Sequence, residues 1–462
     1  MSAREFEEDG IQVGAVDPSK ALPDAEEQIA ELVKDHREHV FIQFFAQRHA
    51  AAALIPFQMG RGVHFWDLRG KKYLDFASQL FNLQLGHQHA GVVEAVRAQA
   101  SEACYIRPTS NTYKVRSALA KRLAAAAPGD LNRVLFTAAG TDAVEYAVKL
   151  AKMATGRDKV CSFYRSYHGS SFGAKSFGGD PKNWAGGSNL PNVYKVHNPY
   201  SYRCPFGYPE GNVDVYVKHV IDTIEYEGPH LTACFLAEPI SGYAGLVIIP
   251  PQGFYQRVAE YCRAKGILFI ADEVMTGFGR TGKMFAIEHW GVVPDLITCA
   301  KGITNGAVPL GAVIASERLA AHFDDNVLFA GLTYSGHPLA MAAALAVLDA
   351  FENERVLERC AASGLLLAER LQQIKRSHPK VVGDVRSSGL LGVIELVTDV
   401  DTREPVSDAI MAAIDKHMAE HGLYTFYRWS MIGICPPLVI SAHDLNVGLD
   451  IIEAAINHHF PQ

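Results

Sequence analysis

Short, continuously apolar runs alternate with segments of helical pattern through most of the middle of the chain. The strand-like runs cover residues 133–137, 159–164, 233–237, 267–271, 296–300 and 310–315, and helical patterns cover 90–103, 115–126 and 141–155. Apolar runs of this kind are typical of strands that are buried on both faces, in parallel sheets covered by helices. The sequence therefore predicts an α/β fold with a mostly parallel central sheet. In such sheets, ligands bind at the carboxyl ends of the strands.

The two ends of the chain have a different pattern. Residues 24–47 are charged and helical, and aromatic strands are expected at 63–67 and 72–76. After residue 338, helices are expected at 339–351, 355–374 and 407–421, with strands at 390–397 and 431–438. A chain of 462 residues is long enough for more than one core. We predict an N-terminal arm with part of a small domain (1–72), a large domain (73–335) and a C-terminal small domain (336–462).

Charge and composition exclude several classes of protein. Lys and Arg number 43 against 50 Asp and Glu, a net charge of −7, so no basic excess favours nucleic acid. No run of about 20 uncharged apolar residues suits a membrane helix, and the acidic first forty residues do not resemble a secretion signal. The eight cysteines contain no CxxC pair, which favours reduced, buried thiols over a metal or disulfide framework. We expect a cytoplasmic enzyme without a bound metal.

One glycine motif suggests a dinucleotide site. Residues 277–282 match the pattern G-x-G-x-x-G. In a dinucleotide-binding fold the first glycine follows a strand directly, and a helix opens at the third. Here five residues, 272–276, separate the expected strand from the first glycine, and the residues after the third do not read as a helix. An NAD(P) oxidoreductase is therefore only a distant alternative.

Four features at expected strand ends fit one cofactor. Gly140 and Thr141 follow a strand and open a helix, where free N–H groups suit a phosphate. Asp272 ends an apolar strand, and its carboxylate could keep a ring nitrogen protonated. Lys301 follows another apolar strand, where a partly desolvated amine could react with an aldehyde. Tyr167 follows a third strand and offers an aromatic plate.

Each feature also has an ordinary structural explanation, namely a helix cap, a turn cap or a surface lysine. Together, a phosphate cradle, an aromatic plate, an acid and a lysine are the parts of a site for pyridoxal 5′-phosphate (PLP). This cofactor acts as an electron sink for a carbanion. The combination predicts a PLP enzyme.

Longer motifs make the sequence similar to a known family, the class III (ornithine/ω-amino-acid type) aminotransferases of PLP fold type I. The resemblance runs from residue 73 to Cys435-Pro436-Pro437. The most specific motifs are Ala-Glu-Pro at 237–239, Ala-Asp-Glu-Val-Met-Thr-Gly-Phe-Gly-Arg-Thr-Gly at 271–282, Ala-Lys-Gly at 300–302 and Thr-Tyr-Ser-Gly-His-Pro at 333–338. The resemblance implies a large PLP-binding domain and a smaller α/β domain built from both termini.

The resemblance also implies roles for individual residues. Lys301 would form the Schiff base with PLP and shuttle the proton, and Asp272 would hold the pyridine nitrogen. Val274 and Tyr167 would cover the two faces of the ring. Gly140 and Thr141 would bind the phosphate. Thr333 would reach the same phosphate from a partner subunit, which implies a homodimer.

The chain departs from the family pattern at two places. Residues 138–141 read Ala-Ala-Gly-Thr where Ser-Gly-Ser is usual, which removes one hydrogen-bond donor. Arg428 lies near the position of a mobile arginine that binds keto-acid carboxylates in related enzymes. The alternative is a solvated loop arginine that stacks on Trp429. Candidates for substrate contact are Phe81, Arg428 and Glu238.

The expected reaction is ping-pong transamination from an ω-amino or primary amine donor to a keto acid or aldehyde. A PLP-dependent aminomutase or lyase is the main alternative. The sequence leaves the donor and the acceptor open.

Overall fold

A seven-stranded sheet with the order β4-β10-β9-β8-β7-β5-β6 forms the centre of the larger part of the molecule. The structure, a computed structural model, describes residues 19–44, 46–50, 54–185, 187–208 and 212–461. The strands of this sheet are β4 (Leu131–Thr137), β5 (Lys159–Phe163), β6 (Val193–Val196), β7 (Thr232–Ala237), β8 (Leu268–Asp272), β9 (Leu296–Cys299) and β10 (Gly311–Ser316). Every residue of β7, β8, β9 and β10 is buried, which explains their continuous apolar runs.

The sheet is mostly parallel, as the sequence predicts. β5 pairs parallel with β6 and β7, and β8 pairs parallel with β7 and β9. The exception is β10, which pairs antiparallel with both β4 and β9. The carboxyl ends of β4, β5, β7, β8 and β9 consequently meet at one edge.

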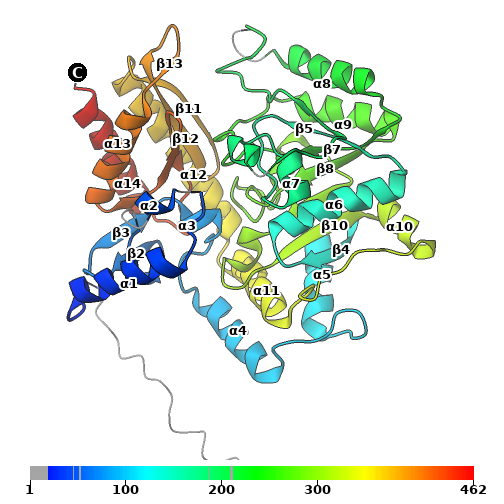
Figure 1. Cartoon of the computed structure of the whole chain (residues 1–462), viewed down its shortest axis with the longest axis horizontal. Helices are drawn as coiled ribbons and strands as arrows, with labels where there is room; N and C mark the ends of the chain where they lie inside the picture. Colours follow the sequence, from blue (N-terminus) through cyan, green and yellow to red (C-terminus); the bar gives the residue numbers. More distant parts are fainter. Residues whose placement is uncertain (1–18, 45, 51–53, 186, 209–211, 462) are drawn as a thin grey trace, which may run out of the picture.

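Helices cover the large sheet (Figure 1). α6 (Gly140–Thr155) packs on β7, β9 and β10, while α8 (Val213–Glu227) and α9 (Phe254–Lys265) pack on each other. α4 (Ala90–Glu102) and α5 (Lys114–Ala126) both pack against α11 (Pro338–Asn353). Shorter helices are α3 (Ser78–Phe81), α7 (Phe172–Phe177) and α10 (Glu317–Asp325).

The smaller part contains segments from both ends of the sequence, which lie side by side in Figure 1 in blue and in orange to red. One sheet has the order β1-β2-β3-β14, and C-terminal β14 pairs parallel with N-terminal β3. A second sheet has the order β11-β12-β16-β15. The strands are β1 (Phe57–Arg61), β2 (His64–Asp67), β3 (Lys72–Asp75), β11 (Val382–Ser388), β12 (Leu391–Asp399), β13 (Glu404–Pro405), β14 (Leu423–Tyr424), β15 (Phe426–Arg428) and β16 (Met431–Ile434).

Helices α1 (Ala25–His39), α2 (Gln47–Ala50), α12 (Val356–Ser377), α13 (Asp408–Glu420) and α14 (Ala442–His459) complete the smaller part. The predicted architecture, a large α/β domain with a smaller α/β domain from both termini, is confirmed. The first 18 residues of the predicted arm lie outside the described residues, and the domain limits at 72 and 335 stay a prediction. In the described part of the chain, no helix is both long and apolar enough to cross a membrane.

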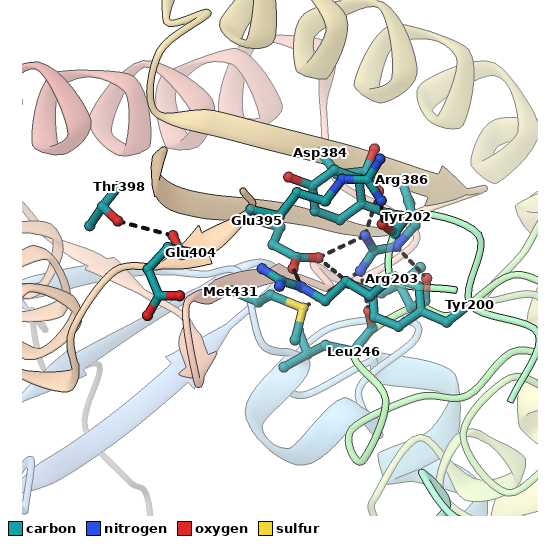
Figure 2. Close-up of polar contacts among 12 residues, drawn as sticks. Tyr200, Tyr202, Arg203, Leu246, Asp384, Arg386, Glu395, Thr398, Glu404 and Met431 are labelled. Carbon is teal, nitrogen blue, oxygen red and sulfur yellow. Dashed lines mark hydrogen bonds and ion pairs between the residues drawn. The ribbon is translucent and has the colours of Figure 1, made fainter. Parts of the chain in front are cut away.

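A buried polar cluster joins the two parts (Figure 2). Glu395 on β12 is 1% exposed and accepts hydrogen bonds from Arg386 on β11 and from Arg203 and Tyr200, which follow β6. Burial alone would raise the pKa of Glu395, but Arg386 and the hydrogen bonds from Tyr200 and Arg203 outweigh it and lower the pKa. The carboxylate is therefore held charged where the domains meet.

Candidate functional site

The predicted cofactor residues come together at the carboxyl edge of the large sheet. Asp272 is the last residue of β8, Lys301 follows β9, and Gly140 opens α6 after β4. A Cβ atom on Gly140 would lie 2.8 Å from Cγ1 of Val274 and 3.3 Å from Cβ of Ala300. The start of α6 thus lies so close to the residues beside Asp272 and Lys301 that position 140 has no room for a side chain.

Asp272 is buried and fully hydrogen-bonded. Its Oδ1 accepts bonds from Thr298 Oγ1 at 2.9 Å and from the backbone N–H of Val274 at 3.1 Å. Its Oδ2 lies 2.6 Å from Nδ1 of His168, whose side chain has no exposed surface. The carboxylate is fixed in position, as a group that orients a ring nitrogen must be.

His168 and its neighbour Tyr167 lie on the loop after β5. Nε2 of His168 is buried and has no hydrogen-bond partner among the described residues. The backbone N–H of Tyr167 donates to Oε1 of Glu238 at 2.9 Å, and Oε2 of Glu238 accepts from Gly242 N–H at 2.9 Å. Burial raises the pKa of Glu238 to about 7. Glu238 therefore ties together the two loops that follow β5 and β7.

Lys301 combines an unusual backbone with a perturbed amine. Its φ angle is 48°, in the left-handed region, where a side-chain-bearing residue costs on the order of 1–3 kcal/mol. Burial lowers the pKa of its amine, although the carboxylates of Asp272 and Glu238 oppose this. The lowered pKa increases the fraction of free base, which is the form that reacts with a carbonyl.

A cradle lies at the start of α6, where helix N–H groups have no partner within the helix. Gly169 has φ 130°, and a Cβ atom there would lie 2.5 Å from Oγ1 of Thr141. The loop carrying Tyr167 and His168 thus packs against the same helix start as the residues after β8. The macrodipole of this 16-residue helix favours an anion at this end.

Aromatic side chains form a wall beside Lys301. Nζ of Lys301 lies 6.0 Å from the ring centroid of Phe81. The Phe81 ring contacts Phe426 at 4.7 Å and Tyr243 at 6.0 Å between centroids. The guanidinium of Arg428 lies 4.9 Å from the Tyr243 ring centroid. Arg428 is thus connected to the lysine through two aromatic rings.

Arg428 is paired in this structure. Its Nη2 donates to Oδ1 of Asp180 at 2.8 Å, and the two side chains are 10% and 0% exposed. Its guanidinium also lies 4.4 Å from the Trp429 ring centroid. The stacking on Trp429 that the sequence suggests is present, but the arginine is largely buried instead of solvated.

Thr333 lies apart from this group in the chain, on an exposed loop before α11. Its carbonyl oxygen accepts a hydrogen bond from Tyr105 Oη at 2.9 Å. Residues 273–285, which contain the glycine motif, form turns without a helix, so the dinucleotide-binding hypothesis loses its structural basis.

Three contacts at the site are not predicted by the sequence: the bond from His168 to Asp272, the pairing of Asp180 with Arg428, and the contact of the Tyr243 ring with Phe81. Only His168 carried a signal, because it follows Tyr167 at an expected strand end. These groups fit PLP. They are an amine of lowered pKa, a fixed carboxylate for the ring nitrogen, and the start of α6 for the phosphate, where Gly140 leaves room for the close packing of the strand ends.

Comparisons with known proteins agree with this chemistry. The model of the class-III aminotransferase family matches residues 45–456. A probable 4-aminobutyrate aminotransferase of Bacillus subtilis is 40% identical over 408 residues, 86% of this chain and 92% of that protein. An isoleucine 2-epimerase of Lentilactobacillus buchneri is 35% identical over 401 residues, 85% of this chain and 88% of that protein.

Among solved structures, the taurine:2-oxoglutarate aminotransferase of Bifidobacterium kashiwanohense, in complex with PLP and glutamate, superimposes with a TM-score of 0.88 at 38% identity. The match covers 93% of this chain and 97% of that chain. The chain belongs to the class-III aminotransferases, PLP-dependent enzymes that transfer an amino group.

Proposed function

We propose that this enzyme transfers the amino group of an unbranched primary amine carrying an acidic group at its far end to a keto acid. Bound PLP supplies the electron sink that makes the donor carbon acidic. Arg428, at the end of the aromatic wall, would bind the acidic group of the substrate in exchange for its present partner, Asp180. The names of two relatives, a probable 4-aminobutyrate aminotransferase and a taurine:2-oxoglutarate aminotransferase, agree with this class of donor.

The residue roles follow from the contacts at the site. Asp272, fixed by His168 and Thr298, keeps a proton on the ring nitrogen of the cofactor. Lys301 would hold the cofactor through its buried amine, and as a free base the same amine would move the proton at the donor carbon. Phe81, in the aromatic wall beside Lys301, and Val274, which packs against the start of α6 at Gly140, exclude water from the reacting atoms.

Gly140 and Thr141 bind the phosphate at the start of α6, and Tyr167 covers one face of the ring. Glu238 positions the Tyr167 loop, since both of its carboxylate oxygens accept backbone N–H bonds. The single observation that carries the proposal is the fixed carboxylate of Asp272 at the strand edge shared with the Lys301 amine.

A half-reaction screen tests the donor class. The holoenzyme is mixed with 4-aminobutyrate, taurine or a simple alkylamine in the absence of acceptor. We expect one equivalent of carbonyl product per site with the acidic donors, and continued turnover only after pyruvate or 2-oxoglutarate is added. Repeated turnover without acceptor, or loss of optical rotation from a chiral amino acid, would instead favour a lyase, aminomutase or epimerase.

The role of Arg428 has its own test. Arg428→Met should raise KM for 2-oxoglutarate at least tenfold, because a charged hydrogen bond to the carboxylate is lost. An aldehyde acceptor, which has no carboxylate, should react with a kcat/KM within about threefold of the unchanged enzyme. An equal loss of kcat/KM with both acceptors would mean that Arg428 stabilises the loop and does not bind the carboxylate.

We also propose a homodimer in which Thr333 reaches the phosphate of the partner's cofactor. Thr333 is exposed in the single chain, and large apolar side chains around it are exposed as well: Val327, Phe329, Tyr334 and Tyr105. Exposed apolar groups of this kind favour a protein interface. We also propose a cytoplasmic location. The eight free cysteines support it, because disulfides are rare in that compartment.

Mixed dimers test the assignment of Thr333. Lys301→Ala and Thr333→Ala chains are coexpressed with different tags, and the mixed dimer is isolated. If Thr333 acts across the interface, one of the two sites contains neither substitution, so about half of the full activity returns. If Thr333 acts within its own chain, no site is intact and activity stays at about half that of the Thr333→Ala homodimer.

A further inference from the structure

Four histidines gather where two helices of the smaller part end. His417 lies in the last turn of α13, His421 caps that helix, and His458 and His459 close α14. α13 and α14 pack against each other (Figure 1). The ring centroids of His417 and His421 are 4.3 Å apart, and those of His417 and His458 are 4.9 Å apart. The cluster is separate from the site around Lys301, which belongs to the large sheet.

The nitrogen atoms of this cluster converge. His417, His458 and His459 each offer one ring nitrogen, and these three atoms lie within 4.8 Å of one another. A tetrahedral zinc ion with Zn–N bonds of about 2.1 Å holds its ligand nitrogens roughly 3.4 Å apart. Small side-chain rotations would therefore bring the three nitrogens to bonding distance without moving either helix.

Two of the histidines have a ring nitrogen available for a ligand. Nε2 of His459 is buried and has no hydrogen-bond partner among the described residues, an arrangement that native structures avoid unless something is bound there. Nδ1 of His421 lies 2.8 Å from the carbonyl oxygen of His417. Because a carbonyl only accepts, Nδ1 carries the hydrogen, and Nε2 of the neutral ring keeps its lone pair.

The surroundings favour a cation. Both helices present their C-terminal ends here, and the unpaired carbonyl groups of a helix C-terminus carry a partial negative charge. The cluster is open to solvent, since His458 is exposed, so an ion can enter.

We infer that His417, His458 and His459 bind one divalent transition-metal ion of the zinc class, which ties the end of α14 to the end of α13. Imidazole nitrogens suit Zn²⁺, Ni²⁺ and Cu²⁺, whereas Ca²⁺ and Mg²⁺ prefer oxygen ligands. The fourth ligand is water or Nε2 of His421. The ion has a structural role, because its three ligands come from two helices that pack against each other.

The test uses the PLP-loaded full chain, freed of any histidine tag, with Cys104→Ser in every sample because Cys104 is exposed. Zn²⁺ binding is titrated by competition with a chelating dye, and Co²⁺ is added to give visible d–d bands that report the ligand geometry. The variants are His458→Ala and His459→Gln, and His443→Ala is the matched control, an exposed histidine in the first turn of the same helix.

We expect one Zn²⁺ per chain, a higher thermal midpoint when the ion is bound, and Co²⁺ bands of a four-coordinate nitrogen site. His458→Ala and His459→Gln should each weaken binding at least tenfold and abolish the thermal shift, while His443→Ala leaves both unchanged. Equal binding by all variants, or no binding above the level of Ca²⁺, would overturn the inference. The His421→Ala variant then distinguishes between the two candidates for the fourth ligand, a water molecule and Nε2 of His421.

Discussion

Nδ1 of His168 lies 2.6 Å from Oδ2 of Asp272, and both side chains are buried below the strand edge. This bond crosses from the loop after β5 to the end of β8. It fixes the orientation of the carboxylate that we propose faces the ring nitrogen of the cofactor.

The first prediction concerns this bond. His168→Phe removes a hydrogen bond to a carboxylate, worth about 1.5–3 kcal/mol, so we expect PLP to bind roughly 10–100-fold more weakly. His168→Gln, which keeps a donor, should recover part of the loss. His230→Ala, at an exposed histidine, is the control. Cofactor dissociation followed by absorbance measures the effect, and an unchanged affinity in His168→Phe would show that Asp272 needs no such support.

The second prediction concerns the close approach at Gly140. Gly140→Ala places a Cβ atom 2.8 Å from Val274 and 3.3 Å from Ala300, so the start of α6 must move away from the strand ends. Such overpacking costs about 1–3 kcal/mol. We expect PLP affinity to fall about tenfold or more, measured by equilibrium dialysis. Gly91→Ala in α4, where the new methyl group meets only the flexible ring of His89, should bind PLP normally.

The third prediction concerns the contact between the domains. Arg386→Met leaves Glu395 without its main partner, and breaking a buried ion pair costs about 3–5 kcal/mol. We expect a thermal midpoint several degrees lower. Arg318→Met breaks an ion pair with Asp295 in which the arginine is 68% exposed, so its effect should stay below about 1 kcal/mol. Similar losses in the two variants would mean that burial of the pair does not matter.

The fourth prediction concerns pH. Burial raises the pKa of Asp415 on α13 to about 6, above the value of about 3.9 expected in the unfolded chain. At pH 8 the folded state therefore holds a carboxylate that burial disfavours, and the penalty fades as pH falls below 6 toward 4. Asp415→Asn should raise the thermal midpoint at pH 8 and raise it less at pH 5. The exposed Asp408→Asn should give no such pH-dependent gain, and a constant difference across pH would rule out ionisation as the cause.

Much of this architecture could be predicted because burial leaves a local pattern. β8 and β9 are buried at every position, so their apolar runs predict strands, and Asp272 and Lys301 are the polar residues that end those runs. The antiparallel direction of β10 could not be predicted, because its apolar run looks the same in either direction.

The partners at the site were missed for a different reason. Asp180 and Arg428 are 248 positions apart, and His168 and Asp272 are 104 apart. Spacing within an element predicts which residues share a face, but it carries no information about which loops meet across a sheet edge. The pairing of Arg428 with Asp180 therefore could be found only in the folded chain.

The shared sheet of β3 and β14 has a consequence for biosynthesis. The backbone of Leu423 pairs with that of Leu74, and Lys71 bonds to Ala419, 348 positions later. At ~5–20 residues per second the ribosome needs roughly 20–70 s to synthesise that interval. During this time the first three strands have an open edge, so nascent chains of this enzyme should depend on chaperones that shield it until translation ends.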